Sequence, residues 1–236
     1  MKKLLLMLSL AALPAAAQDT PLGSRIRQPT AVVPGDLRNM DQRLVGRLVM
    51  DQFGRCLLST RPVVAQTIMS RSPLGDDLWA QITKNNDLGD CLTTGGMSNV
   101  TLTMQMTALR GAVFKAAYSR DHAAVPAMMP AKGSDGTPPP QPDWLADVTT
   151  PGTAPDAAAT AYAGLRQLAA CVVLNKTDAV HRTLLARPGS DAEASAIAEF
   201  MPAVAGCIPD GQELALTKIV LVGALAEVAQ RLAVTK

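Results

Sequence analysis

Two pairs of cysteines mark an internal duplication in this chain of 236 residues. Cys56 precedes Cys91 by 35 positions, and Cys171 precedes Cys207 by 36. The surrounding residues match as well: 53–58 (FGRCLL) with 168–173 (LAACVV), 68–71 (IMSR) with 184–187 (LLAR), and 109–112 (LRGA) with 221–224 (LVGA). Because a duplicated sequence repeats one structural unit, this feature constrains the architecture more than any other.

Apolar residues within each copy recur at helical spacing, as Val45, Leu48, Val49, Phe53 and Cys56 do in the first copy. Proline and glycine separate these periodic segments. We expect helices at 61–70, 76–91 and 103–118 in the first copy, after the helix that carries Cys56, and at 156–175, 177–186, 191–207 and up to about 234 in the second. The sequence therefore predicts an all-α fold of two tandem four-helix repeats, joined by a Pro/Gly-rich linker.

Composition divides the chain into five expected segments. They are a signal peptide at 1–17, a disordered N-terminal segment at 18–40, a first helical repeat at 41–121, the Pro/Gly-rich linker at 122–155 and a second helical repeat at 156–236. Within the linker, Trp144 and Leu145 are candidates for docking on a repeat.

The start of the chain resembles a secretory signal. Lys2 and Lys3 precede an apolar stretch at 4–17, which ends in three alanines with the small-x-small pattern of a cleavage site. The apolar stretch is too short to span a bilayer, which needs about 20 residues. We expect cleavage after Ala17 and a periplasmic or secreted protein.

Cysteines of an exported chain usually form disulfides. Four cysteines allow three pairings, and the duplication favours Cys56–Cys91 with Cys171–Cys207, because each bond then closes within one repeat. Zinc is the alternative, but zinc sites usually contain closely spaced cysteine pairs that this chain lacks.

A copper site is a further possibility in an exported chain. Met128 and Met129 follow His122 in the linker, and copper binds methionine and histidine. Nothing in the sequence brings these side chains into one coordination sphere. We therefore expect no metal and no other cofactor.

Charge excludes one class of partner. The chain has 22 basic and 20 acidic residues, so loss of Lys2 and Lys3 with the signal peptide leaves a neutral protein. Binding to nucleic acid requires a concentrated basic surface, which this balance does not favour. After the signal peptide we expect no transmembrane segment, since the late apolar run at 219–226 ends at Glu227.

Catalytic patterns are missing from the sequence. The two histidines, His122 in the linker and His181 in the second repeat, have no evident orienting partner, and His181 is matched by Ala65 or Gln66 in the first copy. The sequence contains no Gly-x-Ser-x-Gly, phosphate-binding glycine loop or His-Glu-x-x-His motif. The scattered aspartates suit helix capping better than acid–base chemistry. These observations favour surface histidines and a protein that is not an enzyme.

Basic residues recur at matched positions, where Arg61 pairs with Lys176 and Arg71 pairs with Arg187. These four residues are candidates for contact with an anion, because guanidinium and ammonium groups hold carboxylate or phosphate. The simpler interpretation is that Arg71 and Arg187 end the second helix of each repeat and offset the negative end of its dipole.

Glycine also recurs within the last helix of each repeat, as Gly111 and Gly223. Glycine inside a helix costs about 1 kcal/mol relative to alanine, so a close approach between helices is the expected reason.

The second repeat resembles a group of uncharacterised bacterial exported proteins with paired-cysteine helical repeats. The resemblance rests on Cys171-Val172-Val173, Thr183-Leu184-Leu185-Ala186, Pro188-Gly189-Ser190 and Cys207-Ile208-Pro209, with a looser match in the first repeat. It implies an exported, disulfide-linked helical fold and carries no catalytic residues.

We therefore expect a non-enzymatic interaction module of the cell envelope, whose partner is another envelope protein. The alternatives are a binder of a small apolar ligand in a groove between the repeats, and an enzyme without a recognisable motif.

Overall fold

A computed structural model describes residues 40–74, 78, 80, 82, 88, 90–91, 105–124, 129–130, 142–145, 157–208 and 216–233. Within these residues the protein is all-helical, with no strand. The elements are α1 (Gln42–Thr60), α2 (Pro62–Ser70), α5 (Met106–His122), the 3-10 helix η1 (Asp143–Leu145), α6 (Ala157–Asn175), α7 (Thr177–Leu185), α8 (Asp191–Gly206) and α9 (Lys218–Leu232). The expected signal peptide, the N-terminal segment and most of the expected helix at 76–91 lie outside the described residues.

Local sequence features account for the helix ends. The side chain of Asp41 caps α1 by accepting hydrogen bonds from the backbone N–H groups of Arg43 (2.8 Å) and Leu44 (3.2 Å). Pro62 lies in the first turn of α2, where a missing N–H costs least. Ser190 caps α8 through the N–H of Glu193 (3.2 Å). The starts of α2 and α8 agree closely with the expected ones, since caps and prolines act locally.

The last helix of the first copy differs from its expected range. It was expected at 103–118, whereas α5 runs from Met106 to His122. The residue expected to open the linker, His122, is therefore the last residue of a helix. Part of the expected linker also docks, because Leu145 of η1 is buried in the core between α6 and α9.

Both disulfides have the pairing expected from the sequence. Cys56 of α1 is bonded to Cys91, with the Cα atoms 5.4 Å apart, and Cys171 of α6 is bonded to Cys207 at the end of α8, with the Cα atoms 5.9 Å apart. The first bond is buried and the second is half-buried. The first disulfide joins α1 to a position beyond α2, and the second joins α6 to the end of α8.

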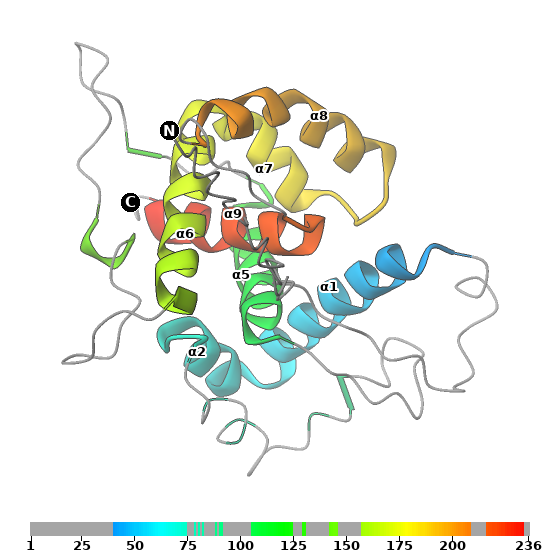
Figure 1. Ribbon diagram of the computed structural model, residues 1–236. Coiled ribbons are helices and arrows are strands. Elements are labelled where there is room, and N and C mark those ends of the chain that lie inside the picture. Colours follow the sequence, from blue (N-terminus) through cyan, green and yellow to red (C-terminus); the bar gives the residue numbers. More distant parts are fainter. Residues whose placement is uncertain are drawn as a thin grey trace, which may run out of the picture.

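The crossing of α5 and α9 forms the centre of the molecule (Figure 1). Helix α1 packs on α5, and α6 packs on α9. At the crossing the two backbones nearly touch, since a Cβ atom added to Gly111 would lie 2.4 Å from the Cα atom of Gly223. The close approach predicted from these two glycines is confirmed.

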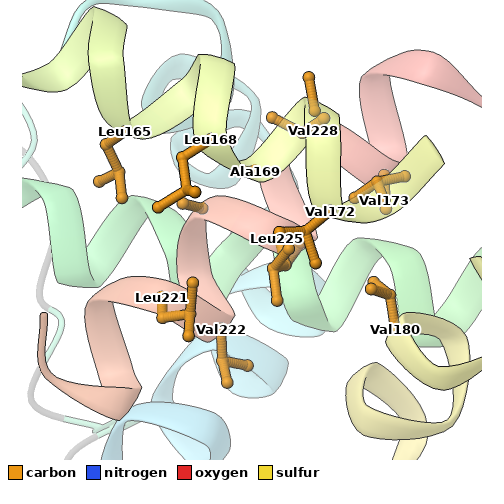
Figure 2. Close-up of a cluster of buried hydrophobic side chains, with 14 of the residues drawn as sticks. Leu165, Leu168, Ala169, Val172, Val173, Val180, Leu221, Val222, Leu225 and Val228 are labelled. Atoms are coloured by element: carbon orange, nitrogen blue, oxygen red, sulfur yellow. The ribbon is translucent and has the colours of Figure 1, made fainter. Parts of the chain in front are cut away.

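The hydrophobic core consists of two clusters that share α5. The larger cluster lies between α6 and α9, where leucine, valine and alanine side chains interlock (Figure 2), and it takes in Phe114 and Tyr118 from α5. The smaller cluster lies among α1, α2 and α5, around Phe53 and Leu57. Because α5 contributes to both clusters, the helices form one continuous body in the described part of the chain.

Helix α6 has the length and composition of a membrane-crossing helix. Half of it is buried inside the protein, against α9 and its neighbours. A core helix of a water-soluble protein passes the same test of length and composition, so this single helix is weak grounds for a membrane span. The late apolar run at 219–226, which was expected to be too short for a membrane span, lies in α9.

Candidate functional site

The strongest concentration of charge lies inside the protein, around the carboxylate of Glu227 on α9. Arg110 of α5 donates two hydrogen bonds to it, from Nε (3.2 Å) and from a terminal nitrogen (3.1 Å). Arg166 of α6 donates a third (2.6 Å), and the hydroxyl of Tyr162 donates a fourth. Arg231 approaches to 3.5 Å from one turn further along α9. We call these five residues the arginine cluster.

The arginine cluster also binds the C-terminal end of α2. Arg110 donates to the backbone carbonyl oxygens of Ile68 and Arg71, and Arg231 donates to that of Met69 (3.1 Å). Carbonyl groups at a helix C-terminus lack partners within the helix and carry partial negative charge. The two guanidinium groups therefore satisfy the end of α2 and gain electrostatic stabilisation from it.

Two guanidinium groups of the arginine cluster lie over the faces of aromatic rings. The centroid of the Phe114 ring lies 4.9 Å from the central guanidinium carbon of Arg110 and 5.5 Å from that of Arg231. The other neighbour of Arg231 is Trp144 of η1, whose centroid is 5.1 Å away. The backbone carbonyl of Trp144 accepts a hydrogen bond from Arg166 (2.9 Å), so the cluster also fixes η1. Such cation–π contacts stabilise a desolvated cation by about 1–2 kcal/mol.

The electrostatics of the cluster favour holding helices over transferring protons. Burial alone would raise the pKa of Glu227, but Arg110 and Arg166 outweigh it and the pKa lies below its usual value. Burial, together with the charge of Glu227, raises the pKa of the Tyr162 hydroxyl well above its usual value. At neutral pH the carboxylate is ionised and the phenol is protonated. A general acid or base needs a pKa near the working pH, which neither group has.

A second buried ion pair joins α1 to α5. Nζ of Lys115 lies 2.6 Å from Asp51, and the same ammonium donates to the backbone carbonyl of Ala186 after α7 (3.0 Å). Asp51 also accepts from Arg55 one turn along α1 (2.9 Å). Lys115 thereby connects α1 with the C-terminal end of α7.

A third pair joins α1 to α8. Arg47 is paired with Glu193, which is almost fully buried and accepts a hydrogen bond from the N–H of Gly189 (2.8 Å). Leu44 packs on Gly189, since a Cβ atom added to Gly189 would lie 2.4 Å from the Cδ1 atom of Leu44. Gly189 has a φ of +81°, which suits glycine. The start of α1 is thus held against the turn between α7 and α8.

A cavity of about 30 Å³ lies beside the Gly111–Gly223 crossing, lined by parts of α1, α5 and α9 and the turn before α8. This volume suits a water molecule, whereas pockets for drug-sized ligands measure about 300–1,000 Å³. No group of three or more metal-ligating side chains occurs in the described part of the chain.

The four matched basic residues predicted to contact anions lie at helix junctions. Arg61 and Arg71 stand at opposite ends of α2, and Lys176 and Arg187 lie at opposite ends of α7. At 1.5 Å per residue, Arg61 and Arg71 are separated by about 15 Å along α2. Contact of each with an anion stays a prediction.

Arg61 also forms an exposed ion pair with Asp90 (3.7 Å). Arg71 directly follows α2, and Arg187 lies two residues after the end of α7, near the helix ends that the dipole interpretation names.

The two histidines differ from the expected isolated surface residues. His181 is half-buried, and its Nδ1 atom forms a hydrogen bond of 3.0 Å with the hydroxyl of Tyr118 on α5. His122 packs on the same tyrosine ring. The orienting partner was missed because Tyr118 and His181 are 63 positions apart in the sequence.

Comparison of the chain with protein-family models, with curated proteins and with solved structures finds no match.

Proposed function

We propose that this protein is an exported, non-enzymatic interaction module of the cell envelope, built from two four-helix repeats that share one core. Its partner would be another envelope protein. The observation that carries the proposal is the use of the buried charges. The ion pairs of Glu227, Lys115 and Glu193 each join helices from the two copies or fix a helix end, and the cluster around Glu227 has no group poised for proton transfer.

Matched ion pairs support the duplication. When Cys56 is aligned with Cys171, and Gly111 with Gly223, Asp51 corresponds to Arg166 and Lys115 corresponds to Glu227. Asp51–Lys115 joins α1 to α5, and Arg166–Glu227 joins α6 to α9. The two pairs thus occupy equivalent places with the signs of the charges exchanged. A buried ion pair kept in both copies is what two related repeats would retain.

Export is part of the proposal, and the disulfides support it. Both are compatible with an oxidising compartment, where such bonds form and persist. Fractionation of the source cells and N-terminal sequencing test this part directly. The expected result is a periplasmic or secreted chain that begins at Gln18. A chain that stays in the cytoplasm with Met1 intact would refute it.

A small-molecule binder is less well supported. The cavity beside Gly111 and Gly223 is too small for a drug-sized ligand, and the near-contact of these backbones closes this part of the interface. No second candidate function is proposed.

Site-specific photo-cross-linking in the source cells tests the interaction role. Val63 of α2 is 75% exposed and Met201 of α8 is 44% exposed, which makes both large apolar side chains suitable positions for a photoreactive residue. Gln167, an exposed polar residue of α6, is the matched control position. We expect a discrete cross-linked product from position 63 or 201 and none from 167. Equal patterns from all three positions would contradict a specific interaction surface.

A further inference from the structure

Both histidines of the chain lie against one buried tyrosine. Tyr118 of α5 is 1% exposed. The ring centroid of His122, on the next turn of α5, lies 4.8 Å from that of Tyr118, and the centroid of His181, on α7, lies 5.8 Å away. The hydroxyl of Tyr118 and Nδ1 of His181 share the hydrogen bond of 3.0 Å. The side chains that titrate between pH 5 and 8 are therefore gathered at one contact between the two copies.

This contact belongs to a seam of side-chain hydrogen bonds that holds α7 against α5. The hydroxyl of Ser119 donates to the backbone carbonyl of Leu184 (3.1 Å), and Lys115 donates to that of Ala186. Serine does not titrate, and lysine ordinarily keeps its charge throughout the neutral range. The bond between Tyr118 and His181 is the member of the seam that includes a group able to change charge near neutral pH.

The surroundings of His181 oppose a positive charge on its ring. Burial lowers the pKa of His181, and the neighbouring His122 and Arg182 act in the same direction. Asp178, one turn earlier on α7, acts in the opposite direction. Arg182 forms an exposed ion pair with Glu199, the charged residue that α8 contributes beside it.

The charges near His122 belong to Asp121. This residue is paired with Arg120 and accepts a hydrogen bond from Gln230 of α9 (2.8 Å). Its carboxylate is therefore shared with two other groups and does not join His181 in an ion pair.

We propose that the contact of Tyr118 with His122 and His181 is an acid-sensitive latch, which holds α7 against α5 at neutral pH and loosens when His181 is protonated. This inference goes beyond the interaction role and does not depend on it. An unprotonated Nδ1 of the neutral ring can accept a hydrogen from the buried phenol, whereas a protonated His181 donates from both ring nitrogens and leaves the phenol hydrogen without this acceptor.

The direction of the effect follows from linkage. The folded protein binds a proton at His181 less readily than the unfolded chain does, because the pKa is lowered from 6.5. The contribution of the contact to stability is therefore complete above about pH 6.5 and is lost as the pH falls toward the pKa of the folded state.

Hydrogen exchange of the full chain, measured at about pH 7.5 and about pH 5.5 and corrected for the intrinsic rates, tests the latch. Helix α2 is an internal control, because it has Ala65 and Gln66 where α7 has His181. We expect acid to speed exchange in α7 at least ~2-fold more than in α2. His181→Asn keeps a neutral acceptor near the position of Nδ1 and should abolish that difference. An equal change in both helices of the wild-type protein, or a difference that persists in the variant, would overturn the proposal.

An NMR titration of the wild-type protein covers the case in which the variant does not fold. The resonances of the two imidazoles report each protonation separately. We expect His181 to titrate below pH 6.5, with the amide resonances of α7 shifting over the same range. Titration of His181 at or above pH 6.5, or titration without a response in α7, would overturn the proposal.

Discussion

Replacement of Gly111 by alanine tests the packing at the centre of the molecule. The added Cβ atom would lie 2.4 Å from the Cα atom of Gly223, which belongs to backbone and cannot rotate away. Ordinary carbon contacts are about 3.5–4.0 Å, so α5 and α9 would have to separate by roughly 1 Å. Overpacking of this kind costs about 1–3 kcal/mol, while alanine regains about 1 kcal/mol of helix propensity. We expect a net loss of up to about 2 kcal/mol.

The matched control is Gly164→Ala on the exposed side of α6. No atom lies within 4 Å of a Cβ atom added there, so only the gain in helix propensity remains. Thermal unfolding should place the Tm of Gly111→Ala below wild type, by up to about 8 °C, and that of Gly164→Ala about 2–4 °C above it. A Gly111→Ala protein at least as stable as wild type would refute the reasoning, since α5 and α9 could not then be in backbone contact.

Two further predictions concern the disulfides and the acid stability. Under limiting reductant, Cys171–Cys207 should be reduced before Cys56–Cys91, because Cys171–Cys207 is half-buried and Cys56–Cys91 is buried. Alkylation and mass spectrometry after a short exposure test the order, and labelling of Cys56 first would contradict it. The lowered pKa of Glu227 means that its stabilising effect is complete above about pH 4.5 and is lost as the pH falls further. Urea unfolding at a series of pH values should therefore show that the free energy of unfolding of Glu227→Gln falls less than that of wild type below about pH 4.5. An equal fall in both proteins would contradict this prediction.

The sequence was sufficient for features that depend on local or repeated patterns. Helix starts such as those marked by Pro62 and Ser190 follow from residue types at single positions. The disulfide pairing and the close approach of Gly111 to Gly223 followed from matching the two copies. In each of these cases the physical cause lies in a few neighbouring residues or in a residue repeated unchanged.

The arginine cluster could not be recognised from the sequence. Arg110 resembles any cation on a helix until its carboxylate is known, and Glu227 is 117 positions away. Matching the copies did not help, because the equivalent ion pairs have opposite signs: Lys115 corresponds to Glu227, and Asp51 to Arg166. A comparison that looks for the same residue type passes over such a pair, although a comparison that looks for paired charge would find it.

The histidines were missed for a related reason. His181 has no histidine counterpart in the first copy, and it was therefore read as an isolated surface residue. Its partner is a tyrosine from the other copy, brought near by the crossing of α5 and α9. Contacts between the copies depend on how they pack together, which the repeat pattern alone does not determine.

A double-mutant cycle on Arg110 and Glu227 tests most directly the claim that the buried charges hold the helices together. Arg110→Met and Glu227→Gln each leave part of a buried ion pair without its partner, a change that costs about 3–5 kcal/mol. Urea unfolding of the two single variants and the double variant should give a coupling energy of at least about 1 kcal/mol, because each single substitution already removes the interaction between Arg110 and Glu227. Strictly additive effects, or single variants as stable as wild type, would contradict the account.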